Sequence, residues 1–184
     1  MTRLRTVLLT SSILLALCGV VAQAQSDKPM QTLQMPAMPD PARITLNSKI
    51  TALMVLDYVE DICATQPKCK SQMLPAMTPF MERVRKAGLV VAYGTRAQNM
   101  AHWLPQVAPA EGDIKIVNTA QDRFYKTDLD KLLKAQGITT MIMVGWKVSG
   151  SVTYTSVGAM IRDYTVVIPV DTTTARNWLL PRGC

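Results

Sequence analysis

Polar residues that could do chemistry follow separate apolar runs: Asp57, Thr95-Arg96, Asn118, and the loop 145–151 that ends in Ser151. A serine hydroxyl can attack a carbonyl carbon when a general base takes its proton, and an aspartate can serve as that base. Asn118 can donate a hydrogen bond to the carbonyl oxygen. Each also has a structural alternative, because serine and asparagine are common at helix N-caps and in turns.

The elements that must position these residues alternate along the chain from residue 50. Apolar runs predict buried parallel strands at 51–56, 89–93, 114–117, 139–144 and 165–170. Helical spacing predicts helices at 70–87, 127–136 and 151–163. A methionine stripe in the first of these helices is expected to lie in the core. The alternation predicts an α/β fold with a parallel sheet, and ligands of such folds bind at the carboxyl ends of the strands.

Composition and charge exclude several classes of protein. The chain has 184 residues, of which 48% are hydrophobic and 18% charged, and this composition is globular rather than disordered. The net charge is +7, but the basic residues are scattered, so we expect no nucleic-acid partner. No glycine-rich phosphate loop follows a strand, and no cofactor is predicted. No stretch beyond the N-terminus approaches the ~20 apolar residues of a membrane span, so we expect no stable membrane insertion.

The first 24 residues have the three parts of a secretory signal peptide. Two arginines precede an uncharged, mostly apolar segment at 7–21, and a small-x-small cleavage site occupies 22–24. Cleavage is expected before Gln25, which predicts a periplasmic or secreted protein. The alternatives are a retained membrane anchor and a lipoprotein attached at Cys18, although the residue before Cys18 is larger than a lipobox prefers.

Residues 25–49 form a proline- and methionine-rich arm before the domain. The segment 25–42 contains four prolines and no clear period, which is typical of an extended linker. It also contains Met30, Met35 and Met38, whose soft thioethers can bind Cu(I). The alternative is that these methionines pack on the surface of the domain.

Export changes the interpretation of the cysteines, because an oxidising compartment favours disulfides. The mature chain keeps Cys63, Cys69 and Cys184, which allow three pairings with one thiol left over. We prefer Cys63–Cys69, since a short loop with a proline turn separates them. Cys184 would then be free or would pair between chains.

Several short motifs occur in a fixed order along residues 50–175. They are the strand that ends in Asp57, Phe124 followed by Thr127-Asp128-Leu129, and a later set made of Gly145, Ser151-Val152, Thr155, Ala159, Arg162 and Tyr164. This ordered set resembles the isochorismatase-like cysteine hydrolase superfamily, which includes the nicotinamidases. The resemblance implies one domain, 50–184, with a Rossmann-like parallel sheet of five to six strands and helices on both faces. It also implies a homo-oligomer, which is common in this family.

The resemblance maps the family's catalytic aspartate, lysine and cysteine onto Asp57, Asn118 and Ser151, so two of the three residue types differ. The family's oxyanion-binding loop maps to Trp146, Lys147 and Ser151, with a cis peptide bond expected between the first two. We expect the pocket to be lined by Tyr58, Arg96 and Phe124. The Asp-x-His metal pattern of nicotinamidases is absent, so the resemblance implies no metal.

These replacements alter the expected chemistry. A cysteine works because its thiolate is accessible near neutral pH, whereas serine needs a positioned base. Asparagine cannot supply the lost positive charge, and Lys147 is a candidate to replace it. We therefore expect an exported hydrolase-like protein that is weakly catalytic or non-catalytic and binds a small molecule in the ancestral pocket. The alternatives are a divergent serine-based hydrolase of small amides, esters or enol ethers, and a methionine-rich metal-binding protein.

Overall fold

The computed structural model describes residues 40–66, 68–96, 102–146 and 148–173. All of the helices and strands described below belong to one compact unit, Pro41–Cys184. The predicted signal peptide, nearly all of the segment 25–42 and Cys184 lie outside the described residues. Among the described residues, no helix is long and apolar enough to cross a membrane.

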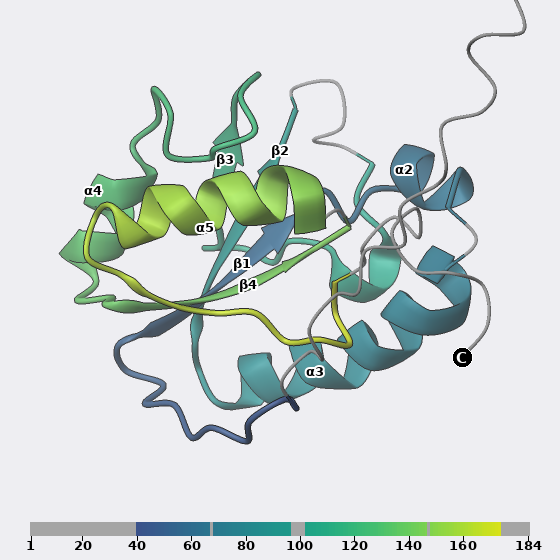
Figure 1. Ribbon diagram of the computed structural model, residues 1–184, viewed down its shortest axis with the longest axis horizontal. Coiled ribbons are helices and arrows are strands. Elements are labelled where there is room, and N and C mark those ends of the chain that lie inside the picture. Colours follow the sequence, from purple (N-terminus) through teal and green to yellow (C-terminus); the bar gives the residue numbers. More distant parts are fainter. Residues whose placement is uncertain (1–39, 67, 97–101, 147, 174–184) are drawn as a thin grey trace, which may run out of the picture. The chain divides into compact units, whose positions relative to one another are not determined.

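The centre of this unit is a five-stranded sheet in the order β3-β2-β1-β4-β5 (Figure 1). The strands are β1 Thr51–Leu56, β2 Val90–Thr95, β3 Ile114–Val117, β4 Thr140–Gly145 and β5 Thr165–Val167. Every neighbouring pair is parallel. The parallel α/β fold is therefore confirmed. The central strand β1 is fully buried, as its continuous apolar run predicts.

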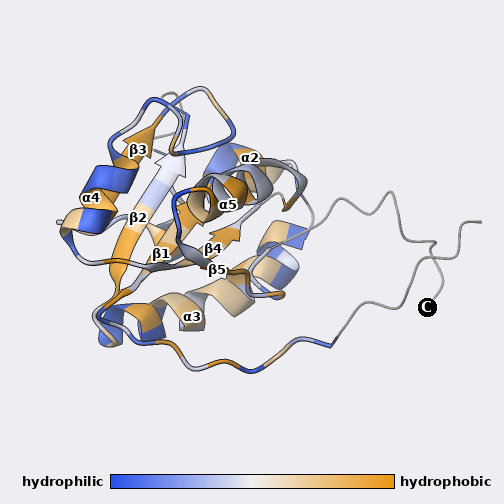
Figure 2. Ribbon diagram, turned by 60° about the vertical axis from the view of Figure 1, so that its left-hand side comes forward, coloured by the Kyte–Doolittle hydropathy of each residue, from blue (hydrophilic) through white to orange (hydrophobic). Residues whose placement is uncertain are grey.

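Helices cover both faces of the sheet. The α-helices are α2 Glu60–Ala64, α3 Leu74–Lys86, α4 Leu129–Ala135 and α5 Thr153–Met160. Shorter helical turns are η1 Cys69–Met73, η3 Pro105–Val107 and η4 Val148–Val152. In Figure 2 the strands are coloured mainly as hydrophobic, whereas α4 carries hydrophilic residues as well.

Alternation along β1 divides the core between these two layers. Leu53 and Val55 pack with the methionines of α3, which confirms the predicted core stripe. On the opposite face, Met54 and Leu56 pack with residues of α4 and α5. The carboxyl end of β1 therefore opens between both helical layers, with the ends of β2 and β4 on either side.

The element boundaries differ from the sequence prediction where local chemistry intervenes. The last strand ends at Val167 rather than residue 170, because Pro169 has no N–H to donate to a sheet. The helix expected at 151–163 consists of η4 and α5, joined beyond a kink at Gly150. The preferred disulfide is present and links Cys63 at the end of α2 to Cys69 at the start of η1.

Candidate functional site

Asp57 occupies the first position after β1, at the centre of the sheet's carboxyl edge. Its backbone N–H donates to the carbonyl of Gly94 at 3.1 Å, and its φ of 57° is in the left-handed region. Aspartate tolerates this conformation better than most residues. The turn places the carboxylate over the end of β2, where Thr95 Oγ1 donates to Oδ1 at 3.0 Å.

Ser151 reaches the same carboxylate from η4. Its Oγ donates to Asp57 Oδ2 at 2.5 Å and lies 3.1 Å from Gln121 Oε1. Just before Ser151 the backbone turns at Gly150, which has φ −130° and ψ −123°. Ser151 and its aspartate partner are 94 positions apart in sequence. The structure thus brings together two of the three predicted triad positions in direct contact.

Arg123, which the sequence analysis did not single out, is the centre of the site. Its Nη2 donates to both oxygens of Asp57 at 3.0 Å and contacts Ser151 Oγ at 3.3 Å. Its Nη1 donates to Asn118 Oδ1 at 2.8 Å and to the Ala120 carbonyl at 2.9 Å. The side chain is only 2% exposed, and Asp57 is 15% exposed. A buried charge requires a partner, and this guanidinium has Asp57.

Gly94 makes room for the arginine stem. A Cβ at this position would lie 2.8 Å from Arg123 Cγ and 2.6 Å from Met54 Cε, closer than real Cβ atoms approach. A residue with a side chain would therefore displace either the stem or the core methionine. The buried position of Arg123 therefore requires a glycine at position 94.

Asn118 joins the site through Arg123. While its Oδ1 accepts from Arg123, its Nδ2 donates to the carbonyls of Asp122 and Tyr125 at 2.8 and 3.1 Å. These contacts use both ends of the amide and fix the loop between β3 and α4. The third predicted triad position therefore holds the arginine in place.

The Ser151 hydroxyl has one donor and two acceptors around it. A hydroxyl has one proton and two acceptor positions. The Ser151 proton can go to Asp57 Oδ2 or to Gln121 Oε1, and one acceptor position receives Arg123 Nη2. Asp57, in turn, accepts from Thr95, Arg123 and Ser151, so the cluster forms a closed network.

The predicted pocket-lining residues occupy different environments. Tyr58 is buried and donates its hydroxyl to the Thr172 carbonyl at 2.8 Å; burial and, secondarily, the nearby Asp171 charge raise its pKa. Phe124 is buried against Tyr164, and Arg96 is exposed. These three predictions stay untested.

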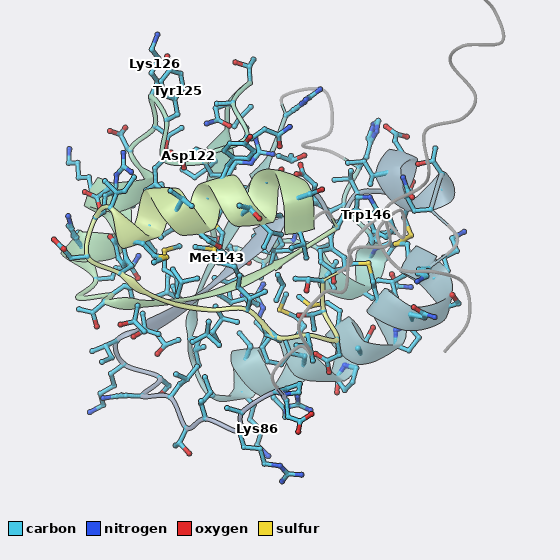
Figure 3. All side chains as sticks on the ribbon, in the orientation of Figure 1. Lys86, Asp122, Tyr125, Lys126, Met143 and Trp146 are labelled. Atoms are coloured by element: carbon cyan, nitrogen blue, oxygen red, sulfur yellow. A yellow bond between two sulfur atoms is a disulfide. The ribbon has the colours of Figure 1, made fainter. Side chains whose placement is uncertain are left out.

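Trp146 is the one described residue of the predicted oxyanion loop besides Ser151. It is partly buried next to the end of β4 (Figure 3), and its backbone N–H donates to the Leu56 carbonyl at 3.3 Å. Lys147 lies outside the described residues, so the cis peptide bond expected between Trp146 and Lys147 is untested. Its suggested role as replacement cation is therefore untested, whereas Arg123 supplies a cation beside Asp57.

Comparison with known proteins identifies the family. The sequence model of the isochorismatase domain matches residues 51–178. The chain belongs to the isochorismatase family. It is 24% identical over 157 residues to a probable inactive nicotinamidase of Arabidopsis thaliana, covering 68% of this chain and 80% of that protein.

Solved structures of other proteins share its fold. N-carbamoylsarcosine amidase from Thermoplasma acidophilum matches with a TM-score of 0.63 and 24% identity, over 69% of this chain and 85% of that one. The nicotinamidase of Staphylococcus aureus matches with a TM-score of 0.62 and 19% identity, over 71% of this chain and 87% of that one.

Sequence reasoning missed Arg123 because nothing in its local pattern distinguishes it from a surface arginine. One signal was available, however. The lysine expected at 118 is an asparagine, and a buried aspartate at the end of β1 still needs a cation. Arg123 and Lys126 are the only basic residues between β3 and α4. A search of that loop for a compensating charge would have found Arg123.

Proposed function

We propose that this protein is an exported member of the isochorismatase family that does not hydrolyse substrates and binds a small molecule at the former catalytic site. The observation that carries the proposal is the position of Arg123, whose guanidinium contacts Asp57, Asn118 and Ser151 at once. Under the resemblance these are the three triad positions. An arginine buried among them converts a reactive site into a closed ion-pair network.

The closed network argues against nucleophilic catalysis. A serine nucleophile needs a lone pair aimed at the substrate carbon and a base free to take its proton. Here the Ser151 hydroxyl donates to Asp57 and accepts from Arg123, and the carboxylate of Asp57 accepts from three side chains. Freeing the serine would require breaking contacts to a charge that is 2% exposed, which is costly. The Arabidopsis relative, which is named a probable inactive nicotinamidase, supports the same proposal.

The exposed part of Asp57 gives the proposed ligand site its polarity. The carboxylate keeps 15% of its surface exposed, and Trp146 and Asn118 are partly buried nearby. A ligand that donates a hydrogen bond, such as a primary amide or an amine, would match the exposed carboxylate edge. It would bind without displacing Arg123.

The N-terminal segment and the disulfide support export. Residues 1–24 have the composition of a signal peptide, and a disulfide closes between Cys63 and Cys69. Stable disulfides are rare in reducing compartments. Comparing the masses of the precursor and of the exported protein tests this part of the proposal. The exported protein should lack the first 24 residues, because cleavage is expected before Gln25.

A turnover screen of the purified protein tests the absence of hydrolysis. The panel contains nicotinamide, isochorismate, and small amides and esters, with Ser151→Ala beside the wild type. Ser156→Ala is the matched control, because Ser156 is also buried and follows on the same chain segment, while its Oγ has no hydrogen-bond partner in the described structure. We expect no turnover above background in any of the three proteins.

The same panel tests ligand binding by thermal shift. A compound that binds the exposed carboxylate should raise the melting temperature of the wild type and of Ser156→Ala, and the shift should disappear in Asp57→Asn. Absence of any such compound would contradict the binding part of the proposal.

One observation favours a second candidate, a serine-based hydrolase. Ser151 Oγ donates directly to Asp57 Oδ2 at 2.5 Å, which is the contact expected between a nucleophile and its base. Turnover by the wild type that is lost in Ser151→Ala and kept in Ser156→Ala would establish this function and overturn our proposal.

A further inference from the structure

A groove lies between α2, the start of α3 and η3, and its volume is about 510 Å³. At the right of Figure 1, α2 lies close to the beginning of α3. We call this the α2–α3 groove and define it by the residues Glu60, Lys70, Leu74, Pro75, Leu104 and Gln106. None of them belongs to the Asp57 network, so the groove is separate from the candidate site.

The floor of the α2–α3 groove is apolar. Leu74 and Leu104 line it and are only 9% and 6% exposed, because their other sides pack in the core. Pro75 adds an exposed apolar ring at the rim. In the described part of the chain no aromatic side chain lines the groove, so a nucleobase finds no stacking partner. A ligand of this groove therefore gains most by bringing aliphatic groups of its own.

Two exposed charges of opposite sign, Glu60 and Lys70, line the same groove. Among the described residues, neither side chain has an ion pair, and the two do not pair with each other. Each is therefore available to a ligand group of opposite charge. Complementary charges select and orient a ligand. A ligand that uses both residues has an ammonium group at one end and a carboxylate at the other.

The disulfide limits how far apart these two charges can lie. Glu60 precedes Cys63 by about one turn of α2, and Lys70 directly follows Cys69 in η1. The Cα atoms of the two cysteines are 5.3 Å apart. The Cα atoms of Glu60 and Lys70 therefore lie no more than about 14 Å apart. An extended dipeptide spans about 7 Å, so it fits between the two side chains when they reach into the groove.

We propose that the α2–α3 groove binds a short aliphatic peptide with two free ends. The ammonium group of the peptide pairs with Glu60, its carboxylate pairs with Lys70, and its side chains lie against Leu74 and Leu104. The Gln106 amide, whose side chain has no hydrogen bond within the described ranges, is available to the peptide backbone. The proposal does not depend on whether the candidate site turns over a substrate, since the two sites share no residue.

Isothermal titration calorimetry of the purified protein with the dipeptide leucyl-leucine tests the groove. We expect the wild type to bind it, and Glu60→Gln and Lys70→Gln each to weaken binding at least about fivefold, because each loses one ion pair with the ligand. Glu111→Gln and Lys115→Gln are the matched controls, since both side chains are exposed and lie outside the groove. They should bind as the wild type does. Circular dichroism verifies that all of the proteins are folded.

Exchanging the two charges gives a second measurement. Glu60→Lys leaves two cations at the groove and should abolish binding of leucyl-leucine. Glu60→Lys/Lys70→Glu should restore binding, because the dipeptide can then bind with its ends exchanged. N-acetyl-leucyl-leucine amide, which carries neither charge, should not bind the wild type measurably. Equal binding of the blocked and the free dipeptide overturns the proposal.

Asp57→Asn separates this groove from the candidate site. Leucyl-leucine should bind Asp57→Asn with wild-type affinity, whereas a ligand of the candidate site should not. Binding that is lost in Asp57→Asn and unchanged in Glu60→Gln would place the dipeptide at the candidate site and overturns the proposal. A wild type that does not bind leucyl-leucine also overturns it, and that result leaves the proposed function of the Asp57 site untouched.

Discussion

Removal of the Arg123 guanidinium tests the physical description of the site most directly. Arg123→Met keeps an apolar stem against Gly94 and abolishes the contacts with Asp57, Asn118 and Ser151. Removing one partner of a buried ion pair costs about 3–5 kcal/mol. Asp57 is 15% exposed and keeps hydrogen bonds from Thr95 and Ser151, so we expect the lower end, about 3 kcal/mol. For a domain of this size that loss lowers Tm by roughly 10 °C.

A double-mutant cycle separates the ion pair from the loss of packing. The second substitution is Asp57→Asn, because asparagine also tolerates the left-handed backbone at this position, φ 57°. Alone it leaves the buried guanidinium without a charged partner and should also destabilise the fold. The double variant removes both charges, and we expect it to be about 2 kcal/mol more stable than the two single losses would predict if added. Urea unfolding followed by circular dichroism, with the disulfide kept oxidised, measures all four proteins.

Additivity would refute this reasoning. If the losses of free energy from Arg123→Met and Asp57→Asn simply sum, the two side chains are not coupled as the 3.0 Å contacts indicate. A loss below about 1 kcal/mol for Arg123→Met would refute the claim that the arginine is buried and paired. Arg83→Met is the control, because Arg83 is exposed on α3 and its substitution should change stability by less than about 0.5 kcal/mol.

Two further predictions concern regions next to the site. Gly158→Ala would place a Cβ 2.5 Å from Asp122 Oδ1, which holds the Phe124 N–H; we expect a loss of about 1–3 kcal/mol in thermal unfolding, relieved in Gly158→Ala/Asp122→Ala. The absence of that relief would show that Asp122 is not the obstacle. Burial raises the pKa of Tyr93 from 10.0 to about 12, so the folded protein keeps the phenol proton longer than the unfolded chain does. The contribution of Tyr93 to the free energy of unfolding is therefore complete below pH 10 and is lost as the pH rises toward 12. We expect Tyr93→Phe to lose less stability than the wild type over this pH range. An equal loss in both proteins would contradict this.

Local patterns in the sequence were sufficient for the fold and for two residues of the site. The apolar run before Asp57 predicts a buried central strand, and the structure places it there. Asp57 and Ser151 could be selected because strand ends and the loop before α5 lie at one edge of a parallel sheet. The pair Cys63 and Cys69 could be selected from the short loop between them, which limits how far apart their sulfurs can lie.

The tertiary structure alone decided what the candidate residues contact. Arg123 is 66 positions from Asp57 in sequence, and its segment has neither helical nor strand periodicity. Whether an arginine in such a loop is exposed or buried depends on where three strand ends converge, and no pattern in its own neighbourhood encodes that. The exposure of the apolar residues Tyr154, Val157, Met160 and Ile161 at α5 has the same origin. Periodicity predicts a helix there, but which of its apolar faces meets the sheet is determined only when the helix packs, because burial is a property of the surroundings and not of the segment.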